Sequence, residues 1–325
     1  MEKNLQILSG GTEIMGNSDF SIVIPVFNAE RSLNELSERI KKTLSGITEN
    51  YEVLLIDDYS RDSSWELLKK LRDSDERIKI IHLAKNSGQH NAILCGLKYS
   101  KGKKIIIMDD DLQNPPEEIS KLIDKSNQGY RVVYGKYLEK RQGALQKACG
   151  FFYHYLLHRI LDTPNEIYFS NFVIMTSDVK DNLLAIKSSY SFLTALIAKT
   201  TPSDRIANVD VIHNDREFGE SNYGMLKHFK LFTNLIINQS SIPLQVMGII
   251  GGFVSVLSLL YGSYLMINKL INPSFGLEGW NSLMVTLTLL GGLILMSVAF
   301  IGEYLRRILV ELTFSQPYIV DEMEL

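Results

Sequence analysis

The sequence is poor in cysteine, and the two that occur do not have the spacing of a metal-binding finger. Cys95 and Cys149 lie far apart, and no C-x-x-C pair is present. This pattern is typical of a protein kept in a reducing compartment, where disulfides are rare. We expect both thiols to be reduced and buried, and we assign them no chemical role.

An excess of positive charge is also absent. The 325 residues include 34 Lys and Arg against 37 Asp and Glu, a formal net charge of −3. Domains that bind nucleic acid usually carry a basic face that pairs with phosphates. The charge balance therefore argues against nucleic acid as a partner.

Residues 1–19 lack the apolar core of a signal peptide. They indicate a short polar leader before the first strand, and we therefore expect no secretion through such a signal.

Two long segments near the C-terminus contain no charged residue. Leu244–Asn268 and Gly279–Gly302 lack Asp, Glu, Lys and Arg altogether. Each is long enough to cross about 30 Å of hydrocarbon as a helix, which takes roughly 20 residues. Two buried helices of a soluble core are the alternative, although such helices rarely stay uncharged for so long. We predict transmembrane helices at about 244–268 and 280–303, within a membrane region at 243–305.

The basic residues around these segments predict an orientation. Lys227 and Lys230 precede the first segment, and Arg306 and Arg307 follow the second, whereas the connecting loop carries only Lys269. Basic residues concentrate on the cytoplasmic side of membrane proteins. We therefore expect a multi-pass protein of the cytoplasmic (inner) membrane, with its N-terminal region and its tail at 306–325 in the cytoplasm.

The first 240 residues alternate short apolar runs with helix-like stretches. The runs are SIVIPVF, YEVLLID, IKIIHL and KKIIIMD, and the stretches between them lie at Ser32–Leu44, Ser63–Leu71 and Asn91–Tyr99. This alternation is typical of a parallel sheet with crossover helices. Because the runs are continuously apolar, helices should cover both faces of the sheet. The pattern predicts an α/β domain at 20–222.

Two common phosphate-binding motifs are missing. No G-x-G-x-x-G follows the first apolar run, and no G-x-x-x-x-G-K-[ST] occurs. Neither a Rossmann dinucleotide site nor a P-loop is supported. Ligands of open α/β sheets gather at the carboxyl ends of strands. Here three such ends carry polar groups, at Asn28, Asp57–Asp58 and Asp109–Asp111.

The segment MDDDLQNPPEE contains the strongest chemical signal. If the strand continues, Asp109 and Asp111 share one face and Asp110 points away. Paired carboxylates suit a hard divalent cation that bridges substrate phosphates. We expect Mg²⁺ or Mn²⁺ bound through Asp109, Asp111 and Gln113. A solvated acidic turn is the alternative that this segment alone leaves open.

Four segments in order, SIVIPVFN, VLLIDDYSRD, NSGQHNAILCGL and MDDDLQNPPEE, resemble the inverting GT-A glycosyltransferases that use nucleotide sugars. The element REFGESNY, the two apolar segments and the tail IGEYLRRILVELTFSQPYIV resemble one branch, the polyisoprenyl-phosphate glycosyltransferases. That branch is similar to dolichyl-phosphate mannose synthase and the bacterial undecaprenyl-phosphate sugar transferases. The resemblance implies transfer of a sugar, with inversion, from a nucleotide sugar to a polyisoprenyl phosphate. The product would be a lipid-linked monosaccharide for the cell envelope.

The resemblance also implies roles for individual residues. It implies a donor site formed by Pro25, Phe27, Asp57, Asp58, Met108, Asp110 and Gln113. Within it, Asp57 would support a turn, and Asp58 would accept hydrogen bonds from the base or ribose. The alternative for Asp58 is to cap the helix that follows Asp62.

Catalytic roles are implied for Asp109, Asp111 and Arg216. Arg216 and Ser221 fall on the family's R-x-x-G-x-S element, where they would grip the acceptor phosphate. A surface salt bridge is the alternative for Arg216. Arg141 and Lys136 belong to a loosely matching basic stretch, and solvated surface charge is the alternative for both.

The sequence departs from the family pattern at three positions. Ala29 stands where a Glu is frequent, Asn171 replaces a carboxylate and Asn222 replaces a Lys. The loss at Asn171 is compatible with turnover, because a phosphate ester whose second pKa is about 6 is already ionised at neutral pH. The departures leave the sugar and the nucleotide open.

Residues 223–242 predict an amphipathic helix. Met225, Phe229, Phe232 and Ile236 have helical spacing beside basic residues, which favours a helix at the membrane interface over an ordinary core helix. His154 and His158 have the spacing of a zinc pair but lack the glutamate of H-E-x-x-H.

Glycine pairs in the apolar segments, Gly248 with Gly252 and Gly291 with Gly292, would allow close helix contact or a homo-oligomer.

Two other functions remain as alternatives. A processive polysaccharide synthase would share the catalytic domain, but Trp65 and Trp280 are the only tryptophans and neither follows an Arg, as the Q-x-x-R-W element of those enzymes requires. A membrane protein that binds nucleotide sugar without catalysis is the other alternative.

Overall fold

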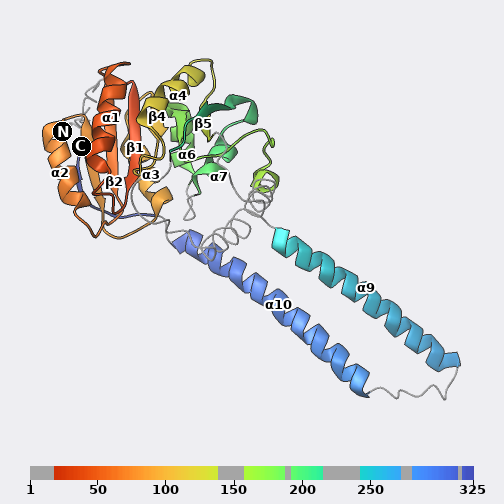
Figure 1. Cartoon of the computed structure of the whole chain (residues 1–325). Helices are drawn as coiled ribbons and strands as arrows, with labels where there is room; N and C mark the ends of the chain where they lie inside the picture. Colours follow the sequence, from red (N-terminus) through yellow and green to blue (C-terminus); the bar gives the residue numbers. More distant parts are fainter. Residues whose placement is uncertain (1–17, 138–156, 187–191, 215–241, 272–279, 314–316) are drawn as a thin grey trace, which may run out of the picture.

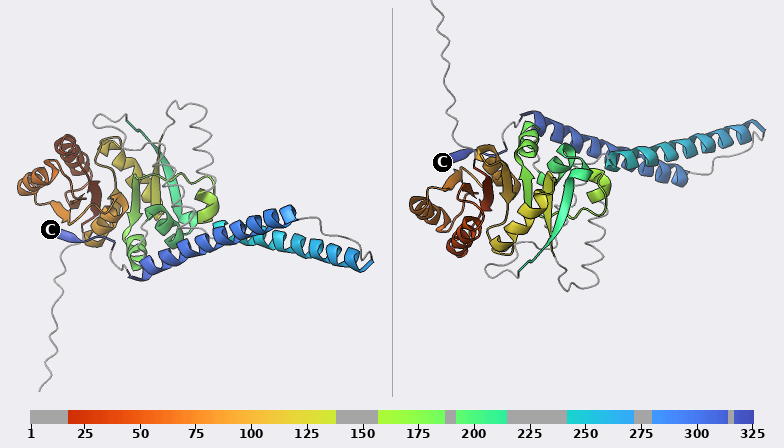
Figure 2. Two further views of the ribbon diagram at one scale, coloured as in Figure 1. Left: turned by 90° about the horizontal axis from the view of Figure 1, so that it is seen from below. Right: turned by 90° about the horizontal axis from the view of Figure 1, so that it is seen from above.

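The computed structural model describes residues 18–137, 157–186, 192–214, 242–271, 280–313 and 317–325. An α/β domain lies at one end of the molecule, and the long helices α9 (Ile242–Ile271) and α10 (Trp280–Thr313) extend away from it side by side (Figures 1 and 2). Both helices cover the segments for which membrane spans were predicted.

One sheet of eight strands organises the domain, in the order β7-β5-β6-β4-β1-β2-β3-β8. The strands are β1 (Phe20–Val26), β2 (Tyr51–Asp57), β3 (Ile78–Leu83), β4 (Lys104–Ile107), β5 (Val132–Tyr137), β6 (Val173–Thr176), β7 (Ile206–Val211) and β8 (Val320–Glu324). Strands β1 to β4 are parallel, whereas β6 and β8 run antiparallel to their neighbours. The predicted, mostly parallel α/β fold is confirmed.

Helices cover both faces of this sheet (Figure 1). The helices of the domain are α1 (Leu33–Ser45), α2 (Ser64–Ser74), α3 (Gln89–Tyr99), α4 (Ile119–Ser126), α6 (Ser177–Ala185) and α7 (Leu193–Thr200), with short 3₁₀ turns at Pro116–Glu118 and Ser203–Arg205. Helices α3, α6 and α7 contribute to one buried cluster, and α1, α2 and α4 contribute to the other. The continuous apolarity of the strands follows from this double coverage.

Regular apolar spacing explains how the helices attach. In α1, Leu33, Leu36, Ile40 and Leu44 recur every three to four residues and are all buried. Burying one such side chain contributes about 1.5–3 kcal/mol. In α3, Gly96 lies against Val23 and Ile56, where any larger residue would clash. This close approach fixes α3 on the strands whose ends form the site described below.

The long helices expose their apolar residues. Ile249 is 73% exposed and Leu270 is 74% exposed in α9, and Leu289 is 63% exposed in α10. Among the described residues, one window is long and apolar enough to cross a membrane, Leu289–Arg306, and none of it is buried. Two spans therefore remain a prediction, as does their orientation.

Three of the four glycines predicted to allow close helix contact can be examined, whereas the surroundings of Gly252 lie outside the described part of the structure. A Cβ added at Gly248, Gly291 or Gly292 would meet no atom within 4 Å. These three glycines therefore make no close helix contact within the described part of the chain, and the homo-oligomer remains a prediction.

The C-terminal tail contains a strand that the sequence analysis did not predict. Helix α10 continues past residue 303 to Thr313, and β8 then pairs with β3, the edge strand of the parallel part. The amide of Ala84 donates to the carbonyl of Ile319 at 2.9 Å, and Lys69 forms an ion pair with Glu322 at 3.0 Å. Residues 320–324 are thus joined to the sheet of the α/β domain.

Candidate donor and metal site

The carboxyl ends of β1, β2 and β4 meet at one edge of the sheet, because β1 pairs in parallel with both neighbours. A hydrogen bond of 3.0 Å from the amide of Phe27 to Oδ2 of Asp110 joins the ends of β1 and β4. Phe27 is 41% exposed, whereas Pro25 and Met108 are buried in or beside their strands. We call this region the donor edge.

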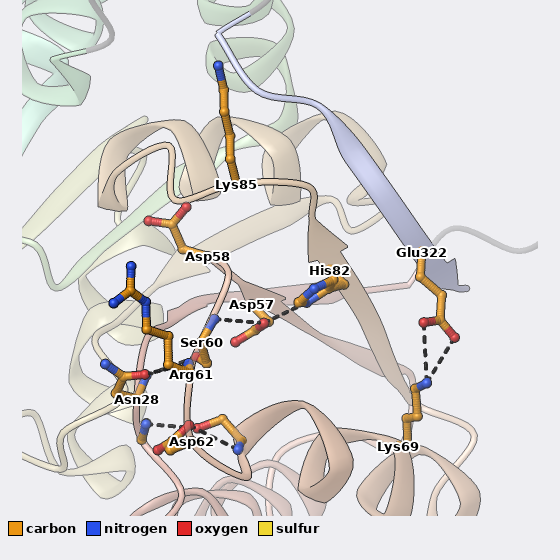
Figure 3. Close-up of polar contacts among 12 residues, drawn as sticks. Asn28, Asp57, Asp58, Ser60, Arg61, Asp62, Lys69, His82, Lys85 and Glu322 are labelled. Atoms are coloured by element: carbon orange, nitrogen blue, oxygen red, sulfur yellow. Dashed lines mark hydrogen bonds and ion pairs between the residues drawn. The ribbon is translucent and has the colours of Figure 1, made fainter.

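Two residues in the left-handed region shape the donor edge. Asn28 has φ of 54° and Tyr59 has φ of 63°, a conformation that non-glycine residues adopt at a cost of about 1–2 kcal/mol. Hydrogen bonds offset this cost, since the amide of Asn28 donates to Oγ of Ser60 at 2.9 Å and the amide of Arg61 donates to Oδ1 of Asn28 at 2.8 Å. These bonds connect the turn after β1 to the turn after β2 (Figure 3).

Asp57 lies inside the second turn. Its Oδ2 accepts a hydrogen bond from the amide of Ser60 at 3.2 Å and lies 2.6 Å from Nδ1 of His82 (Figure 3). The residue is fully buried, and His82 packs against Trp65 with ring centroids 4.8 Å apart. These contacts are structural, and contact of Asp57 with a donor stays a prediction.

Asp58 faces away from this pair and holds the loop after β3 (Figure 3). Its two carboxylate oxygens accept hydrogen bonds from the amides of Ser87 at 2.6 Å and Gly88 at 2.9 Å. Burial raises the pKa of Asp58, while the two amides oppose the shift. The capping alternative is wrong, because both oxygens of Asp58 accept from this loop, and it is Asp62 that accepts from the amide of Ser64 at the start of α2. Contact between Asp58 and a base stays a prediction.

Two amide side chains contact Asp109. Nε2 of Gln89 donates to its Oδ1 at 2.5 Å, and Nδ2 of Asn171 lies 3.5 Å from its Oδ2. Gln89 is the first residue of α3, and Asn171 precedes β6. The sequence analysis quoted the segment around Gln89 without giving this residue a role. Its position after a glycine, two residues before the helix-like stretch predicted at Asn91–Tyr99, was the available signal.

Asp111 and Gln113 lie on a tight turn after β4. Leu112, with φ of 59°, is buried and reverses the chain, so that the amide of Gln113 donates to Oδ1 of Asp111 at 3.2 Å. Nε2 of Gln113 lies 3.4 Å from the carbonyl of Asn214. A metal-binding role for Gln113 stays a prediction.

The carboxylates of Asp109 and Asp111 are suitable ligands for a hard divalent cation. Asp109 and Asp111 are only partly buried and offer carboxylate oxygens, the ligands that Mg²⁺ and Mn²⁺ prefer. Within the described ranges, no group of three or more His, Cys, Asp or Glu side chains could hold a metal. Asp109 and Asp111 alone would thus need further ligands, such as phosphate or water, to hold a cation.

Asp110 differs from its two neighbours. Asp110 is partly buried, as Asp109 and Asp111 are; this burial, and then the charges of its neighbours, raise the pKa of Asp110, against the effect of the Phe27 amide. Its contact with Phe27 indicates a role in holding the strand ends together rather than in binding the metal.

Only part of the predicted acceptor site is described. Lys136 is an exposed residue of β5, and the next residue, Tyr137, stacks on His213 with ring centroids 4.1 Å apart. Burial raises the pKa of Tyr137. Arg141, Arg216 and Ser221 lie outside the described residues, as does nearly all of the interfacial helix predicted at 223–242.

The histidine pair also lies partly outside the described residues, which exclude His154. His158 is buried, and its Nδ1 lies 3.0 Å from Oγ1 of Thr163. The Thr163 hydroxyl thus gives the buried Nδ1 of His158 a hydrogen-bond partner that is not a metal.

Comparison with known proteins relates this geometry to a family. Residues 21–177 match Glycosyl transferase family 2. An uncharacterised glycosyltransferase of Bacillus subtilis is 33% identical over 93% of each chain. The undecaprenyl-phosphate 4-deoxy-4-formamido-L-arabinose transferase of Shewanella sediminis is 32% identical over 94% of this chain and 93% of its own.

A solved structure supports the fold. Glucosyl-3-phosphoglycerate synthase from Mycobacterium tuberculosis, in complex with Mn²⁺, UDP and glucosyl-3-phosphoglycerate, aligns with a TM-score of 0.51. The alignment covers 68% of this chain and 78% of that chain at 13% identity, so it bears on the fold alone. With relatives above 30% identity along almost the whole chain, this protein belongs to glycosyl transferase family 2 and is a glycosyltransferase.

Proposed function

We propose that this enzyme transfers a sugar from a nucleotide sugar to a polyisoprenyl phosphate, with inversion, and so produces a lipid-linked monosaccharide. The observation that carries the proposal is the extent of the similarity. A relative named for transfer to undecaprenyl phosphate aligns over 94% of this chain, which includes the long helices as well as the catalytic domain. Similarity limited to residues 21–177 would support only a nucleotide-sugar enzyme.

The donor would lie along the donor edge. Phe27 offers an exposed aromatic ring to a base, and Asp109 and Asp111 would hold Mg²⁺ or Mn²⁺ against the diphosphate. When bound, the cation offsets the negative charge that develops on the departing nucleotide. Contacts within the chain hold these carboxylates in position. The bond between Phe27 and Asp110 joins the ends of β1 and β4, and the side-chain amides of Gln89 and Asn171 orient Asp109.

A phosphate acceptor suits the neutral amide at Asn171. The ionised phosphate ester is a ready nucleophile, so the reaction requires in-line placement rather than removal of a proton by a strong base. Positive charge near the acceptor would reduce repulsion between the two phosphate-bearing substrates. Arg216 and Ser221 are proposed for this role, with Arg141 and Lys136 as further contributors.

The long helices would place this site at the bilayer. Exposed leucines and isoleucines along α9 and α10 suit contact with lipid, and an interfacial helix at 223–242 would bring the donor edge close to the headgroups. Both ends of the chain would then lie in the cytoplasm. A cysteine introduced at Ser274 should react with an impermeant thiol reagent in intact cells, while Cys95 and Cys149 should not. The reverse labelling pattern would contradict this topology.

The function is tested with the full chain in lipid nanodiscs that contain undecaprenyl phosphate. Radiolabelled nucleotide sugars are supplied with Mg²⁺ or Mn²⁺, and the label is followed into extractable lipid. The expected product is a lipid-linked monosaccharide. A polymer would indicate a processive synthase, and donor binding without any product would indicate a non-catalytic binding protein.

A further inference from the structure

We infer that Gln89 is a positioning residue for the metal-binding carboxylate of Asp109, and that Asp58 acts on the metal site through the loop that carries Gln89. The inference rests on one part of the proposed function, the binding of a divalent cation by Asp109. It assigns Asp58 a role distinct from contact with the base or ribose. The relay runs from the end of β2, through the loop after β3, to the end of β4.

The first contact of the relay fixes the loop. Asp58 is 3% exposed, and each of its carboxylate oxygens accepts one backbone amide, from Ser87 and from Gly88. Such paired acceptance holds two consecutive peptide groups in place. Gly88 has φ of 90°, a value that L side chains rarely adopt, and the next residue begins α3. Asp58 therefore sets the point at which α3 starts.

Helix α3 gives the relay its rigidity. Its buried residues are Ala92, Ile93, Leu94, Cys95, Gly96 and Leu97. Gly96 brings the helix backbone directly onto Val23 and Ile56 of the sheet. A side chain at the first turn of a helix packed in this way has a fixed origin relative to the strand ends. Gln89 occupies that position.

The last contact orients the carboxylate. Nε2 of Gln89 donates to Oδ1 of Asp109 at 2.5 Å, and Nδ2 of Asn171 lies 3.5 Å from the other carboxylate oxygen, Oδ2. Each carboxylate oxygen has more than one acceptor position, so an amide donor leaves capacity for a cation. An amide also carries no formal charge and leaves the negative charge of Asp109 intact, whereas Lys or Arg would compete with the metal. Hydrogen-bonded partners of this kind orient metal ligands.

Metal affinity distinguishes this role from a purely structural one. The full chain in nanodiscs is titrated with Mn²⁺, and free Mn²⁺ is measured by electron paramagnetic resonance, without nucleotide and with UDP. Gln89→Ala and the similarly sized Gln89→Met should weaken Mn²⁺ binding by about tenfold, the lower end of the range for partners of metal ligands.

Three further measurements complete the test. Asp58→Asn should weaken Mn²⁺ binding in the same direction, because the substituted amide can accept from only one of the two backbone amides. Gln128→Ala is the matched control, since Gln128 lies after α4 and bonds Lys125. It should leave the affinity unchanged. Thermal unfolding temperatures of Gln89→Ala and Gln89→Met should remain within about 2 °C of wild type, as for a partly exposed residue outside the core.

The outcomes separate this inference from the proposed function. Unchanged Mn²⁺ affinity in both Gln89→Ala and Gln89→Met, with wild type binding normally, overturns the inference and leaves the metal site in place. Failure of the wild type to bind Mn²⁺, with or without UDP, overturns the metal site and the inference together. A tenfold loss confined to the Gln89 and Asp58 variants supports the relay.

Discussion

The catalytic domain buries its apolar side chains, whereas the long helices expose theirs. In the domain, Val23 and Ile24 are completely buried between layers of helices, whereas Ile249 and Leu270 in α9 are more than 70% exposed. A contiguous apolar surface of this kind is unfavourable in water and marks contact with protein or lipid. The comparison teaches that the described part of the domain buries its own apolar side chains, while α9 and α10 leave theirs exposed, as the proposed contact with a bilayer requires.

The two regions also differ in their polar groups. The donor edge holds its polar groups through short contacts between strand ends, such as Phe27 with Asp110 and Asp58 with Ser87. On α9 and α10, the exposed large side chains are mainly apolar. If this division is correct, substitutions at the donor edge should lower transfer activity with little effect on stability. Changes outside it should have little effect on transfer activity.

The largest effect is expected for Asp111→Asn. This substitution removes one negative charge from the proposed cation site, so transfer should fall by about a hundredfold or more, equivalent to roughly 2.7 kcal/mol of transition-state stabilisation. The free energy of unfolding should change by less than about 0.5 kcal/mol, because Asp111 is only partly buried at a strand end. Radiolabel transfer and chemical denaturation provide the two measurements.

Asp73→Asn is the matched control, since Asp73 is exposed near the end of α2, just before β3 and hence at the opposite edge of the sheet from the donor edge. It should retain wild-type transfer. Full activity in excess EDTA, or full activity of Asp111→Asn, would refute the cation site.

The next largest effect concerns Arg216, which we place near the acceptor phosphate. Arg216→Ala should lower transfer to lipid by at least about tenfold, or roughly 1.4 kcal/mol. Arg216→Lys keeps the charge but loses the two-pronged geometry, so it should fall between Ala and wild type. Metal-dependent binding of the donor nucleotide, measured by thermal shift, should change little.

Arg205→Ala provides the comparison for Arg216. Arg205 is exposed and lies just before β7, at the amino end of that strand and hence away from the donor edge. Equal transfer by the two alanine variants under subsaturating acceptor would show that Arg216 is an ordinary surface residue.

Local sequence patterns predicted the parallel part of the fold because each strand and helix there is marked by its own residues. The run SIVIPVF and the spacing of Leu33, Leu36 and Ile40 required no knowledge of distant parts. Strand β8 was missed because VDEME is short, acidic and distant in sequence from β3, its partner. Its pairing is a tertiary contact, which local propensity does not encode.

The same reasoning applies to the site. Asp109 and Asp111 were predicted from their place after an apolar run, and the structure puts them at the donor edge. The hydrogen bonds of Asp58 to Ser87 and Gly88 could not be predicted, since they depend on how the loop after β3 folds back over β2. Sequence reasoning identified Asp58 as important but could not say which groups it contacts.

Strand β8 allows a smaller test of the division between domain and helices. Removal of residues 319–325 deletes the strand and its ion pair with Lys69, and it should lower the stability of the domain by on the order of 1 kcal/mol. Lys69→Ala removes an exposed ion pair, worth about 0.2–1 kcal/mol at most, together with the contact of Nζ with the Trp65 ring at 5.1 Å. Thermal unfolding of both variants in the same nanodiscs gives the comparison. An unchanged unfolding temperature after the deletion would mean that β8 adds nothing to the sheet.

The smallest expected effect concerns backbone strain at the donor edge. Tyr59 occupies a left-handed conformation that glycine adopts freely; the residue is 45% exposed, and its ring centroid lies 5.9 Å from that of His82. Tyr59→Gly relieves the strain but loses this contact and increases the freedom of the unfolded chain, so we expect a net gain of only about 0.5 kcal/mol. Tyr59→Ala keeps the strain without the ring and should destabilise the domain. Chemical denaturation can rank the two variants against wild type, and nucleotide binding should be measured alongside.

If Tyr59→Gly is more stable and binds UDP with Mn²⁺ as wild type does, the strain has no part in donor binding. A gain in stability joined to weaker binding would show that the strained turn shapes the donor edge for its ligand, and a loss of stability would mean that the ring contact outweighs the backbone strain.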